Sequence, residues 1–150
     1  MSVTATTQHD WFNNFVSATM AMILPEPVVP DTDGDIPVHG TTAEAWVRVE
    51  AREPWGVRVF ALAALGVPAK AAVLREINAV NLADRGVRVL LAPNGSVMVD
   101  YLLFADAVTQ DNLRAVLGRV LSVADEIGPL LAAVHGGSTP ISPQPSPSER

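Results

Sequence analysis

The triplet Val-Arg-Val occurs three times in this chain, at 47–49, 57–59 and 87–89. Alternation of apolar and polar residues is typical of a β-strand with one buried face, because successive side chains point to opposite sides of a sheet. A further alternating stretch spans 97–104, and the Pro-Asn-Gly-Ser sequence at 93–96 predicts a tight hairpin turn before it. These stretches predict an antiparallel sheet.

Three segments around the strands carry apolar residues at helical spacing. A first helix is expected from Asp10, which can cap its free N–H groups, to Pro25, which ends it. A second lies between Pro68 and Gly86, and a third begins at Thr109. Their expected buried stripes are Phe12, Phe15, Val16, Met20 and Ile23; Leu74, Ile77, Asn78 and Asn81; and Leu113, Val116, Leu117, Val120, Leu121, Ala124 and Ile127.

The third helix should kink or end at Gly128-Pro129. With a short edge strand at 36–39, the prediction is an α+β fold with an antiparallel sheet of about five strands and three helices. The order is α-β-β-β-α-β-β-α. We predict a flexible N-terminus at 1–9, a single domain at 10–135 and a disordered Pro- and Ser-rich tail at 136–150.

Composition and charge exclude several classes of function. The 150 residues include 10 basic and 16 acidic residues, and the net charge of −6 argues against nucleic acid as a partner. No apolar run approaches the roughly 18 residues of a membrane span. The absence of cysteine excludes disulfides, thiolate metal sites and cysteine nucleophiles. The first lysine or arginine is Arg48, so no secretory signal is recognisable and we expect a cytoplasmic protein.

The strand alternation assigns residues to two faces of the sheet. The apolar face should be covered by the first and last helices, and each buried aliphatic residue there contributes about 1.5–3 kcal/mol. Its members are Val47, Val49, Val57, Val59, Ala61, Val87, Val89, Leu91, Val97, Val99, Tyr101 and Leu103.

The opposite face mixes charged and apolar residues. Its members are Trp46, Arg48, Glu50, Arg58, Phe60, Leu62, Arg88, Leu90, Met98, Asp100, Leu102 and Phe104. The three arginines can pair with Glu50 and Asp100 across strands. The second helix is expected to cover part of this face. Either a partner covers the rest, as a second copy or a bound segment, or the arginine stems and the second helix suffice.

The residues predicted to contact a partner or a second copy come mainly from this mixed face. They are Trp46, Arg48, Trp55, Arg58, Phe60, Leu62, Arg88, Met98 and Leu102. Trp55 is included because a Pro-Trp-Gly turn cannot bury the ring by local packing alone, whereas Trp11 is expected at the edge of the core. Asn78 and Asn81 form a structural polar pair that bonds the adjoining strand or caps the helix; a latch onto a bound peptide is the alternative.

No catalytic motif is present, so we expect neither an enzyme nor a cofactor. The alternative is a small metal- or ligand-dependent enzyme that uses Asp31, Asp33 and Asp35 with His39. The EF-hand pattern fails, because Gly34 at its sixth position puts a valine at the first. An acidic turn is the simpler reading.

The order of elements, together with three motifs, resembles the type III secretion chaperone-like and YbjN-like family. The motifs are Val57-Arg58-Val59-Phe60 leading through Leu65-Gly66-Val67-Pro68 to Ile77-Asn78-Ala79-Val80-Asn81, then Gly95-Ser96-Val97-Met98-Val99, and a last helix ending at Gly136-Gly137. The resemblance covers roughly 10–137. It implies a non-catalytic homodimer that holds an unfolded segment of a partner polypeptide.

Overall fold

The computed structural model describes residues 2–50, 52–83 and 85–143. The elements are α1 (Ser2–Ile23), β1 (Ile36–His39), β2 (Glu44–Glu50), β3 (Gly56–Ala64), α2 (Ala71–Leu82), β4 (Arg88–Leu91), β5 (Val97–Phe104), a short 3-10 turn η1 (Ala105–Ala107) and α3 (Gln110–His135). All strand pairs are antiparallel, in the order β1-β2-β3-β5-β4. This confirms the predicted α+β fold, its five strands and three helices and their order.

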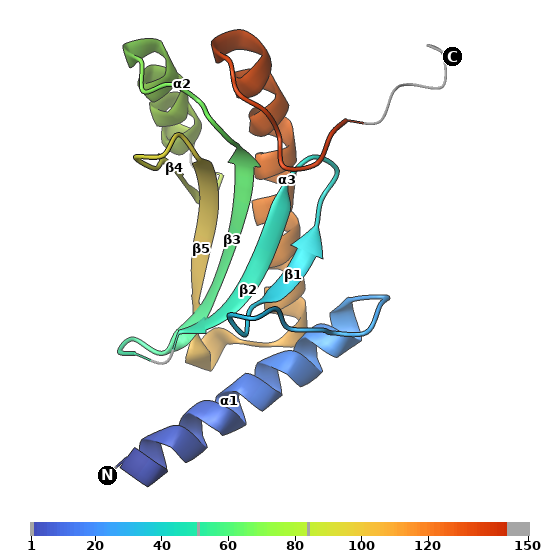
Figure 1. The fold of residues 1–150 in the computed structure, drawn as a ribbon. Coiled ribbons are helices and arrows are strands. Elements are labelled where there is room, and N and C mark those ends of the chain that lie inside the picture. The colour runs from blue at the N-terminus through green and yellow to red at the C-terminus, as the bar shows by residue number, and fades with distance from the viewer. Residues whose placement is uncertain (1, 51, 84, 144–150) are drawn as a thin grey trace.

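One face of the sheet, which we call the inner face, packs against α3 (Figure 1). The residues here that are no more than 3% exposed include Ala45, Val47, Val57, Val59, Ala61, Val89, Val97 and Val99. Opposite them, α3 buries Leu113, Val120, Val123 and Ala124 completely or almost so. Thr109 caps α3 by accepting a hydrogen bond from the backbone N–H of Asn112 at 3.1 Å. The predicted apolar layer under the last helix is therefore confirmed, whereas the first helix, which was expected to share this cover, contacts the sheet mainly at β2.

Pro129 lies inside α3, which continues to His135 rather than ending there. Proline has no N–H, so one helical hydrogen bond is lost, but packing on both sides of it keeps the helix intact. Gly128 lies against β3 so closely that an added Cβ would be 2.0 Å from the carbonyl oxygen of Ala63. The glycine is thus required by this contact and does not end the helix.

The first helix is longer than predicted. It begins at Ser2 and not at Asp10, because 2–9 contain no proline or glycine that would interrupt it. Its C-terminal half packs on α3 and β2, whereas its N-terminal half extends past the end of the sheet (Figure 1). Trp11, predicted at the core edge, is therefore 66% exposed, and its ring stacks on Phe15.

The second helix does not cover the mixed face, which corrects that expectation. It lies beside β4 and α3, with Val73 and Ile77 buried, while Leu74 of the predicted stripe is 51% exposed. His135 of α3 contacts Glu76 of α2 at 2.9 Å. The mixed face, which we call the outer face, carries no helix in the part of the chain that is described.

The predicted disordered tail begins with residues that bond to the domain. Ser138 forms an antiparallel bridge with Leu65 through two hydrogen bonds, at 2.8 and 2.9 Å. The N–H of Ile141 donates to the carbonyl of Thr42 at 2.9 Å. These contacts place the start of the tail against the end of β3 and the β1–β2 loop. The ordered chain therefore continues beyond position 136, where the disordered tail was predicted to begin. The remaining tail residues, 144–150, lie outside the described residues.

Candidate functional site

The outer face is formed by alternate residues of the same strands that build the core. The register puts Trp46 opposite Phe60, and Phe60 opposite Asp100. Arg58 lies between Arg48 on one side and Leu102 on the other. Because these positions share one side of the pleated sheet, their side chains form one continuous surface.

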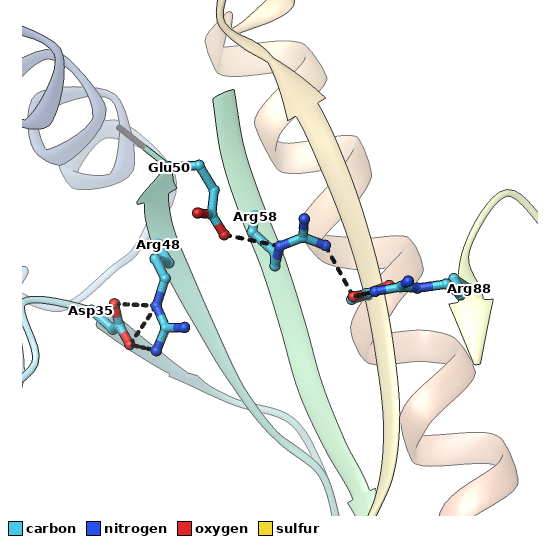
Figure 2. Close-up of polar contacts among 6 residues, drawn as sticks. Asp35, Arg48, Glu50, Arg58 and Arg88 are labelled. Atoms are coloured by element: carbon cyan, nitrogen blue, oxygen red, sulfur yellow. Dashed lines mark hydrogen bonds and ion pairs between the residues drawn. The ribbon is translucent and has the colours of Figure 1, made fainter. Parts of the chain in front are cut away.

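Ion pairs connect β2, β3, β5 and β4 across this surface (Figure 2). Arg58 donates to Glu50 at 3.0 Å and to Asp100 at 3.1 Å. Arg88 donates to the same Asp100 from the other side at 2.9 Å, which raises the pKa of Arg88 above its ordinary value. Asp100 is 6% exposed, and its two arginines supply the charge-assisted bonds that a buried carboxylate needs. The predicted cross-strand pairing of these residues is confirmed.

Arg48 pairs elsewhere than expected. It donates to Asp35, just before β1, through Nε at 3.0 Å and through a terminal nitrogen at 2.6 Å (Figure 2). These hydrogen bonds raise the pKa of Arg48, against a smaller opposing effect of burial. Its guanidinium lies over the ring of Phe60, 4.8 Å from the ring centre, and Phe60 in turn stacks on Trp46 at 5.5 Å. Arg48 is thus held between an aromatic ring and a carboxylate.

Two shallow hollows lie on the outer face. One, of about 260 Å³, is lined by Asp31, Asp33, Asp35, Trp46, Arg48, Phe60 and Leu62. We call it the aspartate hollow. The other, of about 410 Å³, is lined by Arg58, Gly86, Val87, Arg88, Asp100, Tyr101 and Leu102. Met98 is half-buried on the same face, opposite Leu62. Eight of the nine predicted contact residues therefore lie on one surface.

The ninth, Trp55, lies apart from them. Its ring meets Phe12 of α1 edge-on, with ring centres 6.2 Å apart, and it packs partly against the core. A third hollow of about 380 Å³ is lined by Gln8, Trp11, Phe12, Trp55 and Ala105. The turn cannot bury the ring alone, as the sequence indicated, but α1 supplies the cover that local reasoning could not foresee.

The predicted polar pair, Asn78 and Asn81, does not share one role. Asn81 bonds the edge strand β4 twice, donating to the carbonyl of Val89 and accepting from its N–H, both at 2.9 Å. Asn78 is exposed on α2 rather than part of a buried stripe. The strand-bonding role is confirmed for Asn81, and Asn78 does not share it.

The acidic loop and His39 do not assemble into one site. Oxygen atoms of Asp31, Asp33 and Asp35 lie within 4.8 Å of one another. However, Asp31 Oδ1 accepts hydrogen bonds from the backbone N–H groups of Asp33 and Asp35, both at 3.0 Å, which is an ordinary acidic turn. His39 lies 3.6 Å from Glu44 instead of joining the aspartates.

Sequence reasoning missed Asp125 of α3. Its carboxylate accepts backbone hydrogen bonds from Thr41, Thr42 and Ala43, at 2.8–3.0 Å, and so fixes the loop between β1 and β2. Burial raises its pKa, but the three N–H donors and the Thr42 hydroxyl outweigh this and lower the pKa below its ordinary value. The partners are more than 80 positions apart in the chain, so no local signal could have identified it.

Comparison with known proteins agrees with this architecture. The chain matches the family model of "T3SS (YopN, CesT) and YbjN peptide-binding chaperone 1" over residues 10–143, and it belongs to that family. A search of curated proteins finds no match. No helix among the described residues is long and apolar enough to cross a membrane.

Solved structures share the fold. The chain is similar to one in the crystal structure of the ExsC-ExsE complex, with a TM-score of 0.63 and 16% identity over 82% of this chain and 95% of that one. It also resembles a chain of the Yersinia pestis type III secretion chaperone SycH complex with a YscM2 fragment, with a TM-score of 0.57 and 14% identity over 75% and 96%. A chain of the HopA1-SchA chaperone-effector complex gives 0.55 and 11% over 75% and 94%.

Proposed function

We propose that this member of the peptide-binding chaperone family is a homodimer that holds a segment of a partner polypeptide on its outer face. The open outer face carries the proposal. Its aromatic and aliphatic residues Trp46, Phe60, Leu62, Met98 and Leu102 lie beside fixed arginines, with no helix over them among the described residues. Mixed apolar and arginine surfaces are typical of protein interfaces.

The arrangement of side chains on the outer face suits the binding of a polypeptide without catalysis. Strand side chains and their ion pairs form a rigid surface, so a bound segment meets groups that are already in place and little ordering cost falls on the chaperone. The aromatic and aliphatic side chains that line the hollows would provide affinity, and the arginine and aspartate groups would select among segments. The proposal includes no catalytic step and no cofactor.

Oligomeric state is the first test. Light scattering across a dilution series should give a species near twice the chain mass of 15.9 kDa. A mass that stays at one chain at every concentration would contradict the homodimer, and the outer face would then be a surface for a partner alone.

Partner capture is the second test. The variant Phe60→Arg places an additional cation at the centre of the outer face and should abolish capture of an unfolded client, measured as protection of that client from aggregation. The matched control is Leu82→Arg on α2, where an exposed leucine outside the outer face receives the same charge. Leu102→Arg is the second outer-face variant if Phe60→Arg fails to fold. If folded outer-face variants protect as well as wild type, the outer face is not the binding surface.

A further inference from the structure

The two halves of the outer face differ in charge. Near β4 and β5, Arg58 and Arg88 are balanced by Glu50 and Asp100. The aspartate hollow near β1 has three carboxylates against the single guanidinium of Arg48. This half therefore has a surplus of two negative charges beside apolar rings. A segment lying across the face would meet negative potential at one end only.

The floor of the aspartate hollow is apolar. Trp46 and Phe60 stack with ring centres 5.5 Å apart and planes 22° from parallel, and Leu62 continues the same row of strand positions. The hollow of about 260 Å³ has room for one apolar side chain. Its rim already holds a cation in place, since Arg48 lies over Phe60 and bonds Asp35. Aromatic rings next to carboxylates are therefore suited to guanidinium or ammonium groups here.

Two of the three carboxylates are held in position. Asp31 fixes the turn through its two backbone hydrogen bonds, and Asp35 is occupied by Arg48. Asp33 is exposed, and among the described residues it makes no side-chain hydrogen bond or ion pair. A cation arriving at the rim would thus meet Asp31, which is already positioned at low entropic cost, beside the exposed carboxylate of Asp33.

From this geometry we infer that the aspartate hollow selects partner segments in which an apolar side chain lies next to a lysine or arginine. The apolar group packs on Trp46, Phe60 and Leu62, and the cation bonds the carboxylates of Asp31 and Asp33. An acidic residue at the same place is repelled, which provides selection against the wrong segment. The inference rests on the proposed function and specifies its partner chemistry.

The test uses two short synthetic peptides that differ only in charge, one with Phe-Arg pairs and one with Phe-Glu pairs. Backbone and indole NMR signals of the full chain are followed during titration at low salt, with EDTA present to exclude metal ions. The Phe-Arg peptide should bind about five-fold or more tightly and shift the signals of Trp46 and Phe60, and added salt should reduce the difference. Equal binding of both peptides, binding of neither, or shifts confined to the hollow around Trp11 and Trp55 would overturn the inference.

Two variants isolate the carboxylates. Asp33→Asn and Asp31→Asn each remove one charge, and the asparagine at 31 keeps an oxygen for the two backbone N–H groups. Each should weaken binding of the Phe-Arg peptide by about two- to five-fold, with no loss for a neutral Phe-Ser peptide. Asp106→Asn, an exposed aspartate outside the hollow, is the matched control and should change nothing. Equal effects of Asp33→Asn and Asp106→Asn would mean that only net charge matters.

Different results would contradict the proposed binding surface and the proposed charge selection. If the outer-face variants abolish client protection but the peptides are not distinguished, the charge selection is wrong and the outer face remains the binding surface. If the variants leave client protection unchanged, the proposed function on this face is wrong, whichever peptide binds.

Discussion

The inner and outer faces of the sheet come from the same strands but differ in burial and in charge. Neighbouring residues Val57 and Arg58 illustrate this, since the valine is fully buried and the arginine side chain is 29% exposed within an ion-pair network. The inner face is aliphatic and covered by α3, so it supplies the hydrophobic stabilisation. The outer face has no helix over it among the described residues, and its rings and charges are arranged beside water. A single step along each strand therefore separates residues that stabilise the core from residues of the open outer face.

The largest expected effect comes from placing the same charge on each face. Val59→Asp buries a carboxylate under α3 and should cost more than about 4 kcal/mol, enough to unfold the domain. Leu102→Asp puts the charge opposite Arg58 on the outer face and should cost less than about 1 kcal/mol. Urea denaturation measures both. Similar losses would show that the outer face is as much a core as the inner one.

A smaller loss is expected where α3 approaches β3. Gly128→Ala adds a methyl group 2.0 Å from the carbonyl oxygen of Ala63, and the required shift should cost about 2–3 kcal/mol. Gly118→Ala is the control, since an added Cβ there has no atom within 4 Å and improves helix propensity by up to about 1 kcal/mol. Thermal unfolding should therefore move in opposite directions for the two variants. A neutral Gly128→Ala would mean that the inner layer is looser than the structure indicates.

The outer-face network should contribute less to stability. Asp100→Asn removes the charge shared by Arg58 and Arg88 and should cost about 1–2 kcal/mol, because both arginines remain partly solvated. Asp33→Asn, an exposed aspartate of the same face, should stay within about 0.5 kcal/mol of wild type. Equilibrium unfolding in urea distinguishes them. A loss at Asp100 as large as at Val59 would erase the division between the faces.

The smallest effect concerns pH. Because the folded state lowers the pKa of Asp125, its carboxylate stabilises the fold above its ordinary pKa, and this contribution is lost as pH falls through the folded value. Asp125→Asn should therefore show a smaller acid-induced loss of stability than wild type between neutral pH and the acid limb. Urea midpoints measured across that range test the difference. Identical pH profiles would contradict a role for the charge in holding the loop at 41–43.

Local patterns predicted much of the fold. The Val-Arg-Val repeats and the Asn-Gly turn predicted strands and their faces, and Thr109 marked the start of α3 correctly. These succeed because side-chain alternation and helix capping depend on near neighbours in the chain. Pairing of Arg58 and Arg88 with Asp100 followed from the same alternation. Eight of the nine residues predicted to contact a partner lie together on the outer face, and their contact with a partner is a proposal.

Other features depended on distant contacts. Nothing near Trp55 in the sequence indicates that α1 covers it, and nothing near Arg48 distinguishes Asp35 from Glu50 as its partner. The buried stripe of α2 differs from the predicted one, because Val73 and Ile77 face the core while Asn81 bonds the β4 backbone. In each case, several placements satisfy the local pattern, and packing of whole elements selects one.

The sequence by itself determined the element types, the two-faced sheet and the absence of cysteine chemistry, since these follow from residue type and spacing. Tertiary structure alone decided that α2 lies beside α3, that Asp125 holds a loop from the other end of the chain, and that the outer face carries no helix among the described residues. The physical reason is that an amphipathic element specifies which side it buries but not what it is buried against. Only the assembled layers decide which surface stays in contact with water.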